Sequence, residues 1–188
     1  MSTLITRAFT DAEVRTTGDG GRTLVGIAAP FDTPIEVGGY TESIRRGAFA
    51  RTIAERGPGR VKVLSQHNDR SNPIGRASLL REDPAGLYAE LKVSKTQAGD
   101  EVLELIRDGA LDGLSIGFIP VTDQHHPDRN LVERTEVRLQ EISCVTWPAY
   151  ADARVSQVRS SLTPSASLDL ARRRTALAAI LSGASHEL

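Results

Sequence analysis

The sequence predicts an α+β fold that is mainly β. Apolar and polar residues alternate with a period of two in several short runs, which is typical of strands with one buried face. Residues 87–93, 112–119 and 132–146 show this alternation, and residues 22–31, 61–64 and 77–80 are interpreted as further short strands. Residues 96–108 instead carry apolar residues at helical spacing, between a threonine suited to cap a helix and Gly109 as its stop.

The remaining segments complete this outline. Residues 4–14 are a first strand, which we expect to pair with 22–31 as a hairpin across the glycine-rich turn 17–21. Residues 35–40 are interpreted as irregular, and 50–56 as a short helix that ends at Gly57. Residues 122–130 are interpreted as a polar loop before the last strand.

Composition excludes several classes of protein. The chain has 188 residues, of which 39% are hydrophobic and 25% charged, as expected of one soluble domain with a tail. A net charge of −1 and 4% aromatic residues argue against a nucleic-acid partner. No secretory signal and no run of about 18 apolar residues is present, so we expect no membrane association. Cys144 is the only cysteine, which excludes an internal disulfide and fits a reducing compartment.

A change of composition divides the chain. We predict a compact domain over residues 1–155, and a linker rich in serine and arginine with a C-terminal helix over 156–188. A single amphipathic helix of this length is marginal alone, so it needs a partner surface. The tail is therefore expected to lie outside the main domain.

Ser115 lies at the centre of the run 112–119. Leu114, Ile116 and Phe118 can face a core, which leaves Ser115 and Gly117 on the other face. A glycine beside a strand serine lets another backbone approach closely, as a serine nucleophile requires. The alternative is an ordinary serine on a solvated strand face.

Two further residues have the chemistry that would activate such a serine. His67 follows the strand 61–64 in a polar turn and can act as a base near neutrality, although a surface histidine is the alternative. Glu141 shares a predicted strand face with Val137, Leu139, Ser143 and Val145. A carboxylate among such neighbours needs a partner, either a histidine whose tautomer it holds or an arginine. A slipped register or a bulge that puts Glu141 in solvent is the other alternative.

Other polar groups are weaker candidates. His125, His126 and Asp128 have poor spacing for one metal ion, so we expect no metal and no cofactor. Cys144 should face away from Glu141 and is interpreted as a small buried residue rather than a thiol nucleophile. The sequence has no phosphate-binding glycine loop and no G-x-S-x-G elbow.

Four segments in order resemble the prohead (maturation) proteases of tailed phages. They are residues 42–49 (ESIRRGAF), 64–67 with 73–75 (LSQH and PIG), 109–118 (GALDGLSIGF) and 139–149 (LQEISCVTWPA). In the first, Arg46 replaces the usual proline of that family, a departure that bears on the loop. Each motif alone is weak, but the four together cover about residues 22–152.

This resemblance implies a closed or nearly closed β-barrel of mostly antiparallel strands with a few surrounding helices, similar to the herpesvirus assembly proteases. It implies a serine endopeptidase with Ser115 as nucleophile, His67 as base and Glu141 as third member. The related viral proteases use a second histidine in that third place, whereas the family pattern here puts an acid at Glu141. Gly113 and Gly117 would give the substrate strand room.

The resemblance also implies partners and a location. Major capsid protein and scaffold protein would be the substrates, in the host cytoplasm inside the assembling prohead, and a homo-oligomer is left open. Since proteases of this family often trim themselves, residues 156–188 would be a tether or a self-trimmed tail. The alternative function is a non-catalytic module for capsid assembly or scaffold binding on the same fold.

Overall fold

The computed structural model describes residues 4–9 and 21–146. They form a mainly β fold with one nine-stranded sheet, one α-helix and three short helical turns. The strands are β1 (Ile5–Phe9), β2 (Thr23–Pro30), β3 (Ile35–Val37), β4 (Tyr40–Ile44), β5 (Lys62–Ser65), β6 (Gly75–Glu82), β7 (Gly86–Val93), β8 (Gly113–His126) and β9 (Leu131–Val145). The helix is α1 (Gln97–Arg107), and the turns are η1 (Thr52–Arg56), η2 (Pro58–Arg60) and η3 (Pro127–Arg129).

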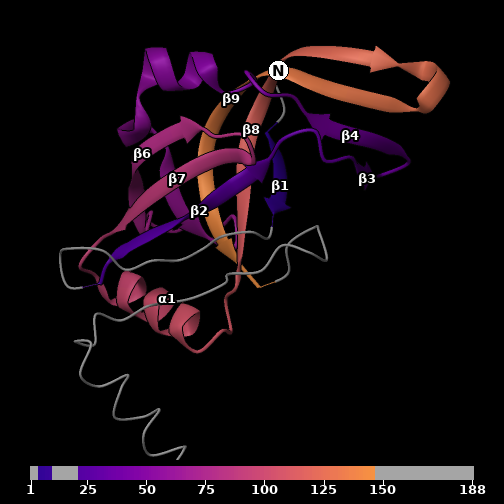
Figure 1. The fold of residues 1–188 in the computed structure, drawn as a ribbon. Helices are drawn as coiled ribbons and strands as arrows, with labels where there is room; N and C mark the ends of the chain where they lie inside the picture. The colour runs from indigo at the N-terminus through magenta and orange to yellow at the C-terminus, as the bar shows by residue number, and fades with distance from the viewer. Residues whose placement is uncertain (1–3, 10–20, 147–188) are drawn as a thin grey trace, which may run out of the picture. The chain divides into compact units, whose positions relative to one another are not determined.

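The sheet is strongly curled and remains open. Its main path is β1-β8-β9-β5-β6-β7-β2, and the β3–β4 hairpin joins it through β4 and β9 (Figure 1). The edge strands β1 and β2 approach to within 8 Å between Cα atoms, but no backbone ladder joins them among the described residues. The expected barrel closure is therefore wrong, and the sheet is an open half-barrel. Likeness to the herpesvirus enzymes stays a prediction.

The strand directions are mixed around β9. β4 and β5 both run parallel to β9, whereas the other described neighbours pair antiparallel. Parallel neighbours require a connection longer than a hairpin. Residues 45–61, between β4 and β5, supply it with η1 and η2. The sequence 41–65 thus covers one edge of β9 along most of its length.

The core fills the inner face of the curled sheet. Leu24, Leu91, Ile116, Phe118 and Ile142, which come from four different strands, are almost fully buried there. The predicted helix is confirmed as α1, with the Thr96 side chain accepting a hydrogen bond from the Gly99 amide and Gly109 in a left-handed conformation at φ 75°. The helix lies at one end of the sheet (Figure 1) and buries Val102, Leu103 and Ile106.

Three sequence-based expectations about connections are wrong. β1 and β2 do not form a hairpin with each other, because β1 pairs with β8 and β2 with β7; residues 10–20 lie outside the described part. Residues 35–44 are a hairpin rather than irregular, and its turn residues Gly38 and Gly39 both have positive φ, as a two-residue hairpin turn requires. The polar segment 122–126 continues β8, so β8 and β9 form one long hairpin (Figure 1), and β4 pairs with the part of β9 near its tip.

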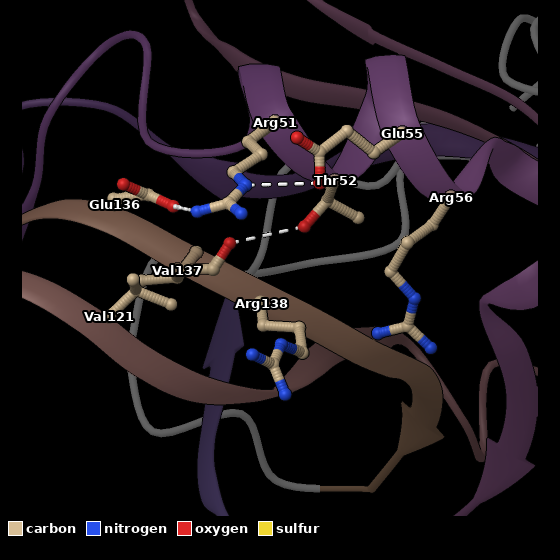
Figure 2. Close-up of a pocket in the computed structure, with 8 residues that line it drawn as sticks. All are labelled: Arg51, Thr52, Glu55, Arg56, Val121, Glu136, Val137 and Arg138. Atoms are coloured by element: carbon tan, nitrogen blue, oxygen red, sulfur yellow. Dashed lines mark hydrogen bonds and ion pairs between the residues drawn. The ribbon is translucent and has the colours of Figure 1, made fainter.

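Two polar clamps hold the connection 45–61 in place. The Glu82 carboxylate accepts hydrogen bonds from the amides of Gly47 and Phe49, both at 2.8 Å. The Thr52 hydroxyl donates to the Val137 carbonyl at 3.1 Å and accepts from the Leu139 amide at 3.2 Å. Figure 2 shows η1 lying over β9 at this point, around a cavity of about 70 Å³. The part of β9 between its pairing with β4 and its pairing with β5 thus finds hydrogen-bond partners for its backbone in η1.

A buried charge cluster explains the glutamate of the first motif. Glu42 is 1% exposed and accepts hydrogen bonds from Arg134 Nε at 2.7 Å and from Arg7 Nε at 2.6 Å. Arg134 also donates to Asp123 at 2.6 Å and to the Tyr40 hydroxyl at 3.2 Å. A buried carboxylate is tolerated only with such partners. Glu42 therefore joins β1, β4 and β9.

Candidate active site

The structure brings Ser115, His67 and Glu141 together on the outer face of the sheet. Ser115 lies in β8, Glu141 in the neighbouring β9, and His67 in the turn that follows β5. β5 and β8 flank β9 on its two sides. The three side chains therefore come from adjacent positions across the sheet although they are up to 74 residues apart in sequence.

Hydrogen bonds join the three residues in series. His67 Nε2 lies 2.5 Å from Ser115 Oγ, and His67 Nδ1 lies 2.6 Å from Glu141 Oε1. Because a carboxylate can only accept, Nδ1 carries the ring proton and Nε2 is left to accept from the serine hydroxyl. The histidine side chain is 24% exposed, while that of Glu141 is 6% exposed. The ring thus lies between a buried carboxylate and a buried hydroxyl.

The turn that carries His67 has an unusual backbone. Gln66 and His67 both have φ 55°, in the left-handed region that residues with a side chain rarely adopt. The Asn68 amide donates to the Ser65 carbonyl at 3.0 Å, which makes residues 65–68 a tight turn of the I′ type. Such strain costs about 1–3 kcal/mol per residue and persists only where the surroundings hold it. This turn folds His67 back over β9.

The left-handed turn is held to the end of β9. The Gln66 amide donates to the Cys144 carbonyl at 2.9 Å, and the Gln66 side chain donates to the Thr146 hydroxyl at 2.5 Å. The His67 amide donates to Ser143 Oγ at 3.1 Å. The backbone of His67 is therefore anchored to the same strand that carries Glu141.

A β-bulge at Gln140 decides where Glu141 points. Leu139 is paired with Phe118 and Glu141 with Gly117, so Gln140 is an extra residue in β9. Leu139 consequently faces the core, and Glu141 faces the site together with Ser143, which is opposite Ser115. The predicted shared face of Leu139 and Glu141 is wrong. The bulge foreseen as an alternative is present, yet it leaves Glu141 only 5% exposed.

Gly117 provides the space for the Glu141 carboxylate. A Cβ atom at position 117 would lie 2.2 Å from Glu141 Oε1 and 2.9 Å from its Cγ and Cδ. The space that the sequence suggested for a substrate strand is thus filled by Glu141. Gly113 is buried at the start of β8 opposite Val145, and its role with substrate stays a prediction.

Ser143 is a member of the site that the sequence reasoning missed. Its hydroxyl donates to Glu141 Oε2 at 2.7 Å while it accepts from the His67 amide. It therefore orients the carboxylate and ties it to the histidine turn. The sequence did contain a signal for Ser143: it lies two residues after Glu141 in the same strand, so both side chains face the same side. The observed register places Ser143 opposite Ser115.

A cleft adjoins the histidine and the carboxylate. It has a volume of about 460 Å³, and its mostly apolar walls include Leu4, Leu64, Pro73 and Ile119 beside His67 and Glu141. Ser115 itself is only 1% exposed, so the open approach expected from the sequence is not seen. The hydroxyl is covered on its site face by the His67 ring. A ligand in the cleft would meet the histidine first.

The other candidates of the sequence lie apart from this site. His126 Nε2 lies 2.7 Å from the Glu133 carboxylate near the tip of the β8–β9 extension, and His125 is exposed beside it. Within the described ranges no group of three or more histidine, cysteine or acidic side chains could hold a metal ion. Cys144 is buried; burial, with the nearby Glu141 charge, raises the pKa of its thiol to about 12. It is therefore poorly suited as a nucleophile.

A serine, a histidine and a carboxylate joined in this order form the arrangement used by nucleophilic serine hydrolases. A sequence model of the caudovirus prohead serine proteases matches residues 10–167. The chain belongs to this family and is a serine protease.

Individual relatives agree with this assignment. The prohead protease of Enterobacteria phage HK97 is 28% identical over 159 residues, which cover 82% of this chain and 68% of that protein. The capsid polyprotein of Pseudomonas phage PAJU2 is 26% identical over 161 residues, 82% of this chain but only 22% of the polyprotein.

One solved structure shows the fold. The capsid assembly protease of bacteriophage T4 superposes with a TM-score of 0.54 over 77% of this chain and 97% of that one, at 12% identity. No helix in the described part of this chain is long and apolar enough to cross a membrane.

Proposed function

We propose that this protease cuts peptide bonds through a Ser115–His67–Glu141 triad. The observation that supports the proposal is the continuous hydrogen-bond series from the serine hydroxyl through both ring nitrogens to one carboxylate oxygen. The sequence motifs nominate the same three residues independently of their geometry. In this series each group has the role that acyl transfer requires.

The proposed reaction follows from the geometry. His67 Nε2 takes the proton of Ser115 Oγ as that oxygen attacks the carbonyl carbon of the scissile peptide bond. Glu141 holds the ring in the tautomer with Nδ1 protonated and stabilises the imidazolium that forms. The imidazolium then protonates the leaving amine, and water hydrolyses the resulting ester on Ser115 by the reverse proton path.

The burial of Ser115 adds a requirement to this mechanism. Since His67 covers the hydroxyl, a substrate in the adjoining cleft has to shift the ring or the turn 65–68 before its carbonyl reaches Oγ. The exposed part of the site is the histidine, at 24% of its side chain. The chain in this conformation is therefore expected to be less reactive than the substrate-bound form.

The proposed substrates are proteins of the assembling phage capsid. The named relatives are a prohead protease, a capsid polyprotein and a capsid assembly protease. We extend this to the major capsid protein and the scaffold protein of the same phage as substrates, cut inside the prohead in the host cytoplasm. Membership in a serine protease family argues against a non-catalytic assembly module.

The test replaces the nucleophile. Ser115→Ala should fold normally and cut the purified capsid protein of the same phage at a rate more than about 1000-fold lower, because triad members act as a unit. Ser78→Ala, on an exposed position of β6, is the matched control and should cut at the normal rate. Rates are read from gels and intact-mass spectra. Cleavage by Ser115→Ala at the normal rate would exclude the proposed nucleophile.

A further inference from the structure

Three cations lie in one row across the outer face of the sheet. Lys62 of β5 is paired with Arg76 of β6, and Arg76 is paired with Lys92 of β7. The same row continues to Glu141, because Lys62 is also paired with that residue. All three cationic residues are exposed, whereas Val63, Ala77 and Val93, the next residues along the strands, are buried. The row therefore begins beside the triad and runs away from it over three strands.

These cations line a groove next to the active-site cleft. The groove has a volume of about 630 Å³, and Arg22 and Lys95 add two more positive charges to its walls. None of its described lining residues is acidic. Lys62 and Pro73 line both this groove and the cleft beside His67, so the two hollows are adjacent.

The row is unfavourable unless something neutralises it. Directly opposed residues on neighbouring strands have Cβ atoms about 5 Å apart, and like charges there destabilise the sheet. Arg22 is compensated by an ion pair with Asp100. Lys62, Arg76 and Lys95 form no ion pair with any carboxylate among the described residues. A chain with a net charge of −1 thus concentrates uncompensated positive charge beside its catalytic groups.

We propose that this groove binds an acidic segment of the polypeptide substrate, next to the bond that is cut. Three strand spacings separate Glu141 from Lys92, or about 14 Å. An extended chain advances about 3.3 Å per residue, so the row reaches about four residues from the site. Aspartate or glutamate residues within that distance would pair with Lys62 and Arg76. This assignment rests on the proposed function of the adjoining site.

A polypeptide fits this groove better than nucleic acid does. The described lining has no aromatic side chain on which a base could stack. The groove also adjoins a cleft whose walls include Leu64, Ile119 and Pro73, and these apolar walls suit side chains of a peptide rather than a phosphate backbone. Nucleic acid is treated as a competing outcome of the test.

Binding is measured with the full chain carrying Ser115→Ala, which separates it from cleavage. The probe is a fluorescein-labelled deca-glutamate peptide, followed by fluorescence anisotropy at low and moderate salt. Lys62→Glu with Arg76→Glu should weaken binding at least tenfold, because both reverse a charge in the row. Arg46→Glu with Arg129→Glu makes the same change of net charge at exposed positions outside the groove and should alter binding less than twofold. Circular dichroism checks that each variant is folded.

Two outcomes would overturn the proposal. If both pairs of substitutions weaken binding of the peptide equally, then its affinity depends only on the net charge of the protein and not on the groove. Tighter binding of a single-stranded DNA decamer, abolished by the Lys62 and Arg76 changes, would make the groove a nucleic-acid site. In an otherwise unaltered chain, deca-glutamate should inhibit cleavage of the capsid protein. If that chain cuts nothing while the binding result holds, the proposed function fails, and what stands is the binding of an acidic peptide to the groove.

Discussion

Gly117→Ala tests the site through a single methyl group. Gly117 has no positive φ, so its backbone accepts alanine, and the three nearest neighbours of the added Cβ all belong to Glu141. At 2.2 Å from Oε1 and 2.9 Å from Cγ and Cδ, the methyl group and the carboxylate cannot occupy their present positions together. We expect the protein to fold and Glu141 to leave its place under His67.

The size of the effect follows from these distances. Ordinary contact between a carbon and its neighbour begins near 3.4 Å. The Glu141 oxygen must therefore retreat by about 1.2 Å, enough to break its 2.6 Å hydrogen bond to His67 Nδ1. A misplacement of about 1 Å can cost about 100-fold in rate, which corresponds to about 2.7 kcal/mol of lost transition-state stabilisation.

A double-mutant cycle assigns the loss to Glu141. Cleavage of purified capsid protein is measured for Gly117→Ala, Glu141→Ala and the double variant, with melting temperatures on the same preparations. In the Glu141→Ala background the methyl group meets no carboxylate, so Gly117→Ala should cost less than about threefold there.

The reasoning would be refuted in two ways. Retention of the normal kcat/KM by Gly117→Ala would mean that Glu141 has no part in orienting the base. The second contrary outcome is a 100-fold loss of rate on Gly117→Ala both with and without Glu141. That result would mean that Gly117 contacts the substrate, as its position beside the serine suggested.

Two further predictions concern buried ionisable groups. Glu42→Ala leaves Arg134 without its main partner, so it should lower the free energy of unfolding, measured by urea titration, by about 3–5 kcal/mol. The control Glu36→Ala, on the exposed face of β3, should change that free energy by less than about 0.5 kcal/mol. Cys144 should resist iodoacetamide in the folded chain at about pH 8.5, because burial raises the pKa of its thiol from 9.0 to about 12. Between these values the unfolded state gives up a proton that the folded state keeps, so stability should fall with rising pH more steeply than in Cys144→Ala. Rapid labelling of the folded chain, or equal stability after Glu42→Ala, would contradict these accounts.

Much of the local structure could be predicted from the sequence. Period-two runs located the strands on which Ser115 and Glu141 lie, and Thr96 with Gly109 marked both ends of α1. Each of these signals is contained within a few neighbouring residues, because strand alternation and helix capping are local. The motifs also nominated His67, the proposed base, whose ring the structure places between the other two side chains.

Only the tertiary structure decided how these pieces face one another. No glycine at Gln140 predicts the bulge from the sequence. The bulge nevertheless places Glu141 on the sheet face of Ser115 instead of the face of Leu139. The left-handed turn at Gln66 and His67 is likewise held by contacts with β9 rather than by its own residue types.

The charge row shows the same limit over a longer range. Lys62, Arg76 and Lys92 are each ordinary exposed strand residues in the sequence. They become neighbours only through the register of three strands, and the parallel pairing of β5 with β9 brings them beside Glu141. A one-residue slip would reverse the face of every side chain in a strand. The sequence by itself therefore indicated which residue types could supply a nucleophile, a base and a carboxylate, and strand register decided which of them meet.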